Sequence, residues 1–198
     1  MAMNSESRLA MDVKIQNVVA VATLNQKIDL LAIMKIFRNV EYRPKRFPGL
    51  VFRLKRPRTA TLIFRTGKMV CTGAKSEKQA YSAVRKVVRE LKKADIIVIG
   101  ELDMYITNMV ASAELVGDID LEVAAQVLDD IMYEPEQFPG AIYRMEGTKV
   151  VTLLFSTGKT VLVGARSEGE LREAAEKVQT NLSENGLLYA RELEEVRS

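Results

Sequence analysis

TLIFRTGKMVCTGAKS at 61–76 is repeated as TLLFSTGKTVLVGARS at 152–167, and the repeat extends well beyond this stretch. YRPKRFPG at 42–49 returns as YEPEQFPG at 133–140, again 91 residues later. Between 15–91 and 106–182 there are 30 identities in 77 positions without a gap. This period is too long for a solenoid unit, so it indicates a duplicated domain with pseudo-two-fold symmetry. A two-fold protein suits a two-fold ligand, of which duplex DNA is the commonest.

The bulk composition is that of an ordinary soluble globular protein. The 198 residues are 47% hydrophobic and 28% charged, enough to bury a core. One cysteine, Cys71, excludes an internal disulfide and fits a reducing compartment. The N-terminus lacks the apolar region of a secretory signal, and the apolar run at 96–99 is too short to span a bilayer. We therefore expect a cytoplasmic protein.

The charge of the chain is distributed unevenly between the repeats. Residues 1–100 carry 21 Lys or Arg against 7 Asp or Glu, whereas residues 101–198 carry 8 against 19. The net charges are therefore +14 and −11. Because the repeat pattern was kept while the sign was inverted, we expect the two halves to meet different surroundings.

Each repeat is predicted to contain a strand, a helix, four strands and a long helix. Alternation and β-branched residues predict strands at 13–21 and 104–112, hairpin strands at 50–54, 59–65, 141–145 and 150–156, and a further strand ending at Gly73 or Gly164. Helices are expected near 29–38 and 120–131, and Ser76 and Ser167 have capping-box spacing for long helices at 76–93 and 167–184. Residues 191–198 are expected to form a frayed charged tail.

The predicted strands are apolar on both faces. In 61–64 one face shows Leu62 and Phe64, and the other shows Ile63 with a threonine. Helices on one side of a sheet can cover only one face, so an apolar face remains bare. Such a surface either binds something or aggregates.

Enzyme chemistry finds little support. The chain has no histidine, which removes histidine-based triads and most zinc sites, and no metal-ligand cluster is visible. Gly158-Lys159-Thr160 resembles the end of a phosphate-binding loop, but the glycine required five residues earlier is Leu153. Asp29 and Asp120 occupy helix starts, where a carboxylate caps free N–H groups. We expect neither catalysis nor a cofactor or metal.

Duplicated phenylalanines and asparagines are the residues that stand out. Phe47 lies in a cationic loop, a poor place for a buried ring, and Phe64 shares its strand face with Leu62. Asn17 and Asn108 interrupt apolar strands at equivalent positions, where asparagine is disfavoured. They either contact symmetry-related acceptors of a ligand or close a bulge, and the sequence leaves both open.

Cations recur at equivalent positions more often than chance predicts. Five of the eight cations of the second half coincide with one in the first, where about two are expected from the density of cations in residues 1–100. These pairs are Arg53 with Arg144, Arg58 with Lys149, Lys68 with Lys159, Lys75 with Arg166, and Lys86 with Lys177. Charge retained in both halves is expected where both touch a phosphate backbone. Lys86 and Lys177 lie in the middle of a helix, where solvated side chains are equally expected.

Together these residues resemble the TATA-binding protein family of the archaeal type. The resemblance covers about residues 12–191 and rests on the tandem repeat, on VKIQNVVA at 13–20, on RFPGLVFR at 46–53 and on 61–76 with its copy. It implies an α+β fold in which the tandem repeat forms a saddle-shaped, curved antiparallel ten-stranded sheet with four helices on the convex face. The first repeat would be 12–100 and the second 101–191, with flexible tails at 1–11 and 192–198.

The resemblance also implies roles for individual residues in DNA minor-groove binding. Two pairs, Phe47 with Phe64 and Phe138 with Phe155, would intercalate at base steps. The residues that would contact base edges are Asn17, Asn108, Val19, Val110, Leu62, Leu153, Val70, Val161, Thr72 and Val163. Val163 departs from the family, which usually has threonine there as in Thr72. The four equivalent cation pairs outside the long helices would contact phosphates.

The family resemblance implies a general transcription initiation factor that binds and bends A·T-rich promoter DNA in the nucleoid. The first Phe-Pro-Gly bend is basic and the second acidic, since the positions of Arg43, Lys45 and Arg46 are occupied by Glu134, Glu136 and Gln137 in the second repeat. The resemblance implies that Glu134 and Glu136 dock transcription factor B, which then brings RNA polymerase. The alternatives are a single-stranded RNA-binding sheet, because exposed phenylalanines stack on bases, and a nucleotide hydrolase built on Gly158-Lys159-Thr160. A homodimer formed through the exposed face in the absence of DNA stays open.

Overall fold

The structure is a computed structural model that describes residues 11–97 and 101–191. The chain divides into two compact units. The first unit is Ile15–Val110, and the second begins at Ala111 and includes the segment before Ile15. The boundary therefore lies inside a strand, β6 (Leu102–Glu114), which begins in the first unit and ends in the second.

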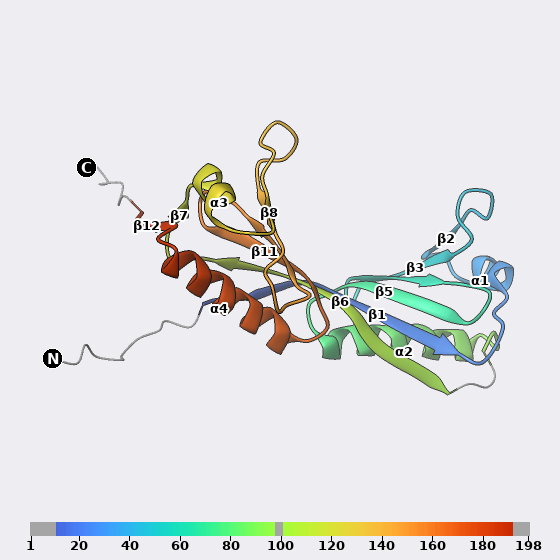
Figure 1. Cartoon of the computed structure of the whole chain (residues 1–198). Helices are drawn as coiled ribbons and strands as arrows, with labels where there is room; N and C mark the ends of the chain where they lie inside the picture. The colour runs from blue at the N-terminus through green and yellow to red at the C-terminus, as the bar shows by residue number, and fades with distance from the viewer. Residues whose placement is uncertain (1–10, 98–100, 192–198) are drawn as a thin grey trace, which may run out of the picture. The chain divides into compact units, whose positions relative to one another are not determined.

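The first unit contains five strands and two helices before β6. In chain order they are β1 (Lys14–Leu24), α1 (Leu30–Ile36), β2 (Val40–Tyr42), β3 (Leu50–Leu54), β4 (Thr59–Ile63), β5 (Lys68–Ala74) and α2 (Glu77–Lys93). The hydrogen-bonded order of its strands is β2-β3-β4-β5-β1-β6. Figure 1 shows α2 running along one face of these strands.

The second unit repeats this arrangement after β6. Its elements are β7 (Asp118–Ile119), α3 (Leu121–Val127), β8 (Ile131–Met132), β9 (Ala141–Tyr143), β10 (Val151–Leu154), β11 (Lys159–Ala165), α4 (Glu168–Glu184) and β12 (Leu188–Tyr189). The strand order continues as β6-β11-β10-β9-β8. The predicted ten-stranded antiparallel sheet with four helices is thus confirmed. Strands β7 and β12 form a separate two-stranded sheet that the sequence did not predict.

The long helices begin where capping was predicted. The Ser76 side chain accepts a hydrogen bond from the N–H of Gln79, and Ser167 accepts one from Glu170. The Gln79 side chain in turn accepts from the N–H of Lys75, one residue before the cap rather than at it. Along α2 the buried residues recur every three or four positions, from Ala80 to Leu91, which directs one stripe of the helix onto the sheet.

The short helices end earlier than predicted. Helix α1 stops at Ile36, and α3 stops at Val127 rather than near 131. The chain after α3 turns through Asp130 at φ 57° into β8, so the apolar Ile131 belongs to a strand. Apolar residues that follow a helix had been interpreted as its continuation.

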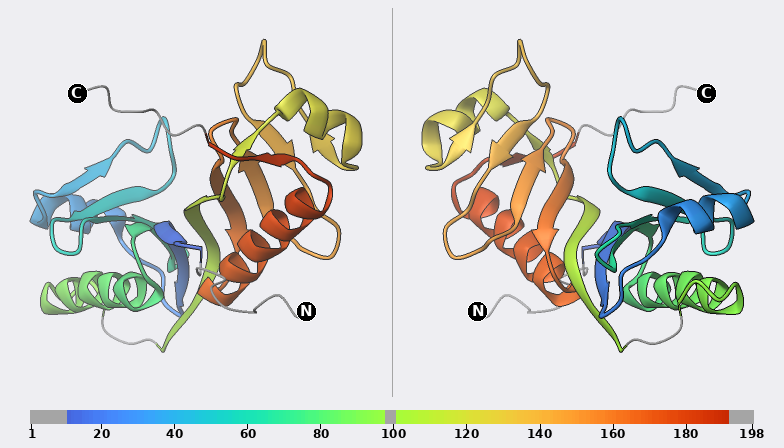
Figure 2. Two further views of the ribbon diagram at one scale, coloured as in Figure 1. Left: turned by 90° about the vertical axis from the view of Figure 1, so that its left-hand side faces the viewer. Right: turned by 90° about the vertical axis from the view of Figure 1, so that its right-hand side faces the viewer.

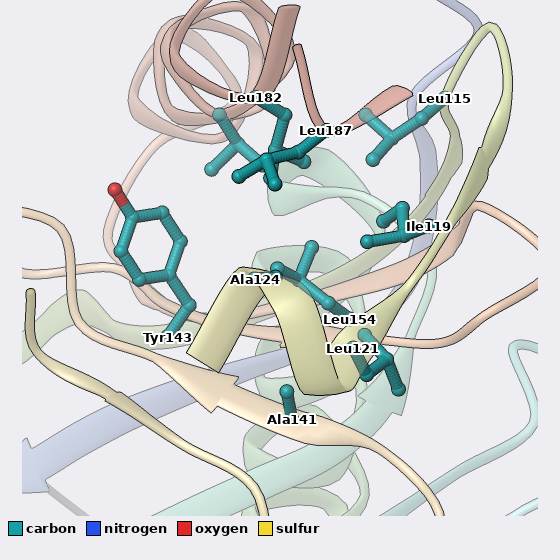
Figure 3. Close-up of a cluster of buried hydrophobic side chains, with 10 residues drawn as sticks. Leu115, Ile119, Leu121, Ala124, Ala141, Tyr143, Leu154, Leu182 and Leu187 are labelled. Atoms are coloured by element: carbon teal, nitrogen blue, oxygen red, sulfur yellow. The ribbon is translucent and has the colours of Figure 1, made fainter. Parts of the chain in front are cut away.

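The core of the second unit is a cluster that joins both of its helices to the sheet (Figure 3). Ala124 comes from α3, Leu182 from α4, and Leu154 from β10, and each is buried. Tyr143 on β9 closes one side of the cluster, where burial raises the pKa of its hydroxyl. Removing a side chain such as Leu182 would cost about 2–5 kcal/mol because the surrounding residues cannot collapse fully.

Only one face of each unit's strands is buried. In β4, Thr59, Thr61 and Ile63 are buried, whereas Ala60 and Leu62 between them are partly exposed. The same alternation occurs in β10. The helices therefore cover a single face, as the residue pattern predicted. No helix of the described residues is long and apolar enough to cross a membrane.

Candidate nucleic-acid interface

Each unit holds one pair of phenylalanines edge to face. The ring centroids of Phe47 and Phe64 lie 5.9 Å apart at an interplanar angle of 68°. Those of Phe138 and Phe155 lie 5.8 Å apart at 69°. Phe47 is 41% exposed and Phe138 37%, which is unusual for rings of this size. The structure thus brings together the members of each predicted pair, in the same geometry twice.

The glycine of each Phe-Pro-Gly bend makes room for these rings. A Cβ at Gly49 would lie 2.6 Å from a ring carbon of Phe47 and 3.0 Å from one of Phe64. At Gly140 the corresponding distances to Phe138 and Phe155 are 2.8 and 3.0 Å. Any side chain at these two positions would push the rings apart. The aromatic pair therefore requires glycine as the third residue of the bend.

A row of aliphatic side chains crosses the partly exposed face beside each pair. Leu62 is opposite both Val51 and Val70 in the strand registers, so the three share one face. In the second unit Leu153 is opposite Ile142 and Val161. Sequence reasoning missed Val51 and Ile142, although their alternation along β3 and β9 could have revealed them. The face is a continuous apolar strip and not a set of isolated contacts.

The asparagines lie on neighbouring strands of the first unit. Asn17 and Val19 are on β1, and Asn108 and Val110 are on β6, which is hydrogen-bonded beside it. The backbone carbonyl of Val19 accepts a hydrogen bond of 3.2 Å from the Thr107 hydroxyl. The structure therefore places the two asparagines and the two valines on a pair of hydrogen-bonded neighbouring strands.

Asn17 has a structural role as well. Its side-chain oxygen accepts from the N–H of Gly73 at 2.7 Å, and its amide nitrogen donates to the Thr72 hydroxyl at 3.1 Å. The β1–β5 register shifts between Val18 and Ala20, so the side chain does close a bulge. An amide has two N–H donors and the Thr72 contact uses at most one. Both readings of Asn17 are thus compatible with its geometry.

The predicted phosphate-binding cations of the first unit lie along one groove. Arg53, Arg58 and Lys75 line it together with Arg38 and Lys55, which had not been singled out. The Lys75 ammonium donates to the carbonyl of Gln16 at 2.7 Å, which holds it at the rim beside β1. Lys68 lies outside this set, exposed at the start of β5. The groove is strongly cationic, since Glu41 is the single acid in its lining.

The cations of the second unit are more dispersed. Lys149 and Arg166 line a smaller pocket with Lys177, whereas Lys159 borders a hollow beside Phe155 and Val161. Arg144 is exposed at the end of β9.

The helical cations have partners of their own. Lys86 donates to the carbonyl of Arg56 at 2.7 Å, and Lys177 forms a 2.7 Å ion pair with Glu173. The hydrogen bond from Lys177 to Glu173, together with the positive charge of Lys177, lowers the pKa of the Glu173 carboxyl. Contacts within the protein therefore account for both side chains, which had been expected to be either phosphate contacts or solvated.

The bends before the phenylalanines share a backbone and differ in charge. The carbonyl of Arg43 accepts from the N–H groups of Arg46 and Phe47, at 2.9 and 3.0 Å. Glu134 accepts in the same way from Gln137 and Phe138, at the same two distances. Glu134 and Glu136 are exposed. An acidic copy of a basic loop, with unaltered hydrogen bonds, would repel a phosphate backbone and attract a basic surface.

Arg191 is a contact residue that sequence reasoning placed wrongly in a frayed tail. Its guanidinium donates to Glu114 at 2.7 Å, to the carbonyl of Leu115 at 3.0 Å and to that of Thr157 at 3.1 Å. It also lies 3.4 Å from Asp118. It thereby fastens the end of the described chain to the turn between β10 and β11, which follows Phe155.

The groups considered for catalysis have structural roles instead. The Thr160 hydroxyl is buried and donates to the carbonyl of Gly158. Gly158 belongs to a hairpin turn, in which its N–H donates to the carbonyl of Phe155. Asp29 and Asp120 each accept two backbone N–H groups at a helix start. Burial raises the pKa of the Cys71 thiol and keeps it protonated.

Comparison with known proteins decides the family. The family model described as "Transcription factor TFIID (or TATA-binding protein, TBP)" matches the chain twice, at residues 12–94 and 103–185. The chain belongs to the TATA-binding protein family. This confirms the resemblance drawn from the repeats. Members of the family are transcription factors, so the prediction that the chain is not an enzyme is confirmed as well.

Archaeal members of the TATA-binding protein family are similar over most of their length. The TATA-box-binding protein of Pyrodictium occultum is 50% identical over 168 residues, which cover 85% of this chain and 84% of that protein. The protein of the same name from Archaeoglobus fulgidus is 45% identical, covering 89% and 97%. The solved structure of Methanococcus jannaschii TBP matches with a TM-score of 0.81 at 44% identity, covering 87% of this chain and 99% of that one.

Proposed function

We propose that the chain is a general transcription initiation factor that binds A·T-rich promoter DNA through the minor groove and bends it. The observation that carries this proposal is the pair of partly exposed phenylalanines found at equivalent positions in both units, each beside an apolar strip. The archaeal relatives, which are named TATA-box-binding proteins, support the same ligand.

The chemistry of the strip favours A·T pairs. In the minor groove these pairs present only acceptors, whereas a G·C pair adds the amino donor of guanine. An apolar strip leaves that donor without a partner, while an asparagine amide on the same face donates to an acceptor. Selectivity for A·T therefore needs no detailed code of hydrogen bonds.

The phenylalanines act as wedges. Apolar side chains inserted between base steps unstack them and kink the duplex, as described for TATA-binding proteins generally. Each pair is already packed edge to face, so little side-chain entropy is lost on insertion. Flexible steps such as TA lower the cost of the deformation.

Recruitment completes the proposed role. The exposed acids of the second bend, Glu134 and Glu136, dock a basic surface of transcription factor B, which brings RNA polymerase to the promoter. The protein acts in the nucleoid of the cytoplasm. Because the first bend is basic, only the second repeat provides this dock.

The experiment compares a TATA duplex with single-stranded RNA of equal length and follows duplex bending by end-to-end fluorescence transfer. We expect preference for the duplex, a bend, and loss of most of the bend in Phe138→Ala/Phe155→Ala. Tyr105→Ala, an exposed aromatic on β6, serves as the control with an unaltered bend. Preference for RNA, or an unchanged bend in the double variant, would contradict the proposal.

Salt dependence tests the phosphate contacts separately. Lys68→Ala should reduce the slope of log affinity against log salt by about one unit, because one counterion fewer is released. Lys86→Ala is the matched control, since that ammonium is held by a backbone carbonyl. An unaltered slope in Lys68→Ala would remove this residue from the interface.

A further inference from the structure

Helix α1 exposes large apolar side chains that the proposed DNA interface does not use. Leu31 is 53% exposed, Met34 43% and Ile36 55%, although α1 has only seven residues. Leu31 and Met34 are three positions apart and lie on one side of the helix. The opposite side, with Leu30 and Ile33, is buried. Apolar side chains gathered on one exposed helix indicate an interaction surface.

The second repeat shows that the fold does not require these residues. Helix α3 has the same length and the same capping by an aspartate, but Glu122 and Ala125 stand where α1 has Leu31 and Met34. Because the second repeat has Glu122 at the exposed position of Leu31, packing within the repeat does not require a leucine there. The apolar surface of α1 is therefore specific to the first repeat.

Cations surround this surface. The segment 27–46, from the residues before α1 to the first bend, carries six Lys or Arg and two acids, a net charge of +4. Lys35 and Arg38 lie beside the apolar residues and are exposed. The partner of this surface should present apolar side chains within a strongly acidic surrounding.

The equivalent surface of the second unit has that chemistry. The aligned segment 118–137 carries seven acids and no Lys or Arg, a net charge of −7. One large apolar side chain is exposed on α3, Val127 at 49%, whereas Met132 on β8 lies opposite Ile142 and faces the apolar strip. Glu122 and Asp129 are exposed near Val127 in the chain.

We propose that copies of this chain associate with one another, with the α1 surface of one copy docked on the α3 surface of another. We define the α1 surface as Leu31, Met34, Lys35, Ile36 and Arg38, and the α3 surface as Glu122, Gln126, Val127 and Asp129. Figure 2 shows α1 and α3 at the outside of the strands of their own units.

The partner of the α1 surface is a second copy of the chain, because the chain itself carries a surface of complementary charge on α3. Each surface has exposed apolar side chains, Leu31, Met34 and Ile36 on one and Val127 on the other, and the segments that carry them have opposite net charge, with Arg38 aligned with Asp129. The contacting surfaces differ, so the interface is heterologous, and each copy keeps one free surface after a contact forms. Two seven-residue helices bury little area, so the association is weak and falls with salt.

The test exchanges residues between the repeats. One variant, Leu31→Glu/Met34→Ala, gives α1 the residues of α3, and the other, Gln126→Lys/Asp129→Arg, gives α3 those of α1. All four positions are exposed or lie on short helices that tolerate the new residue in the other repeat. Sedimentation at about 50 mM salt, where screening is weak, and about 100 µM protein measures the mean mass.

We expect the mass of the unaltered chain to rise with concentration and each variant to associate at least tenfold more weakly. An equimolar mixture of the two variants should form dimers and nothing larger, because one intact surface of each kind remains. This rescue by mixing is specific to a heterologous contact. A monomeric unaltered chain, or variants that associate as it does, would overturn the proposal.

Two further outcomes would also overturn it. A dimer that a TATA duplex dissociates and that neither variant affects would use the exposed sheet faces instead. An association abolished by nuclease would be mediated by nucleic acid. Equal thermal unfolding of the variants and the parent excludes misfolding. If a double variant unfolds early, the single changes Lys35→Gln and Asp129→Arg replace it, with the same expected direction.

Discussion

The bend of the first unit and that of the second have the same backbone and opposite charge. Phe47 and Phe138 each donate a 3.0 Å hydrogen bond to the carbonyl four residues before them, which belongs to Arg43 in one bend and to Glu134 in the other. Their rings meet their partners at 5.9 and 5.8 Å. The backbone hydrogen bonds common to both bends hold the phenylalanine in place, whereas the side chains that differ in charge are exposed.

This difference separates two kinds of constraint on a duplicated chain. Features that both repeats keep, such as the phenylalanine pairs and the aliphatic strips, point to a ligand that touches both halves. Features that only one repeat has, such as the apolar surface of α1 or the acids of the second bend, point to partners that touch one half. The surface residues of the two repeats therefore fall into two groups, those that face a ligand common to both halves and those that face a partner of one half.

The largest expected effect tests a constraint common to both units. A Cβ at Gly67 or at Gly158 would lie 2.2 Å from a backbone oxygen, of Leu24 or Gly117 respectively, and both glycines have positive φ. Gly67→Ala and Gly158→Ala should each lower the free energy of unfolding by about 3 kcal/mol or more, as backbone must shift. Gly147→Ala, with φ +77° and nothing within 4 Å of its Cβ, should cost about 1–2 kcal/mol. Denaturant unfolding measures all three, and equal losses would refute the close approach.

Charge reversal of the second bend should remove the charge difference between the two bends, and with it the contact with transcription factor B. Glu134→Lys/Glu136→Lys makes this bend resemble the first, so we expect ternary complexes with transcription factor B to weaken by about 10–100-fold, or 1.4–2.8 kcal/mol. DNA affinity without the factor should not fall. The mirror variant Arg43→Glu/Lys45→Glu should leave recruitment intact. Gel-shift titration of the factor measures both, and normal ternary complexes in the first variant would exclude the acidic dock.

Removal of the Arg191 contacts should weaken only the second unit. Arg191→Ala loses hydrogen bonds to Glu114 and two carbonyls, and we expect a loss of about 1–2 kcal/mol because the side chain is partly exposed. Gln26→Ala removes the analogous support in the first unit, where the amide donates to the carbonyl of Ile96, and should cost less. Hydrogen exchange should show faster opening of the turn at Thr157 in Arg191→Ala alone. Equal exchange in the two variants would contradict a local role.

The smallest expected effect concerns one hydroxyl. Thr72→Val removes one of the two hydrogen-bond partners of Asn17, the other being the N–H of Gly73, and should cost about 0.5–1.5 kcal/mol of stability. It also gives the first unit the residue that the second has at position 163. Val163→Thr makes the reverse change and should alter stability by less than the first. Thermal unfolding of both variants and of the exchanged double variant measures the difference; a neutral Thr72→Val would show that the Asn17–Thr72 bond adds nothing.

Much of the fold was predictable because the repeat doubles each local pattern. Ser76 and Ser167 marked the starts of the long helices, and the alternation in 61–64 identified the bare face. Arg191 was not predictable, because its partners are carbonyls and acids far away in the chain. Strands β7 and β12 were missed since two residues carry no alternation. The end of α3 was overestimated because Ile131 looks the same in a helix and in a strand.

The candidate site shows the same division. Phe47 and Phe64 were paired through the family resemblance, and the structure brings their rings together. Val51 and Ile142 were missed because their strands are short, and because the register that places them beside Leu62 and Leu153 is not visible in the sequence. Arg38 and Lys55 join the basic groove because β2 and β3, next to which they lie, belong to one sheet with β4, β5 and β1. Such neighbours follow from strand order, which periodicity cannot supply.

Gly49 and Gly140 restrict the order in which this chain can evolve. A Cβ at Gly49 or Gly140 would lie less than 3 Å from the phenylalanine ring two residues before it. A larger residue can therefore be accepted there only after that phenylalanine has been replaced by a smaller residue. Reversal then needs two coordinated changes. Descendants that abandon an aromatic wedge should therefore rarely regain it.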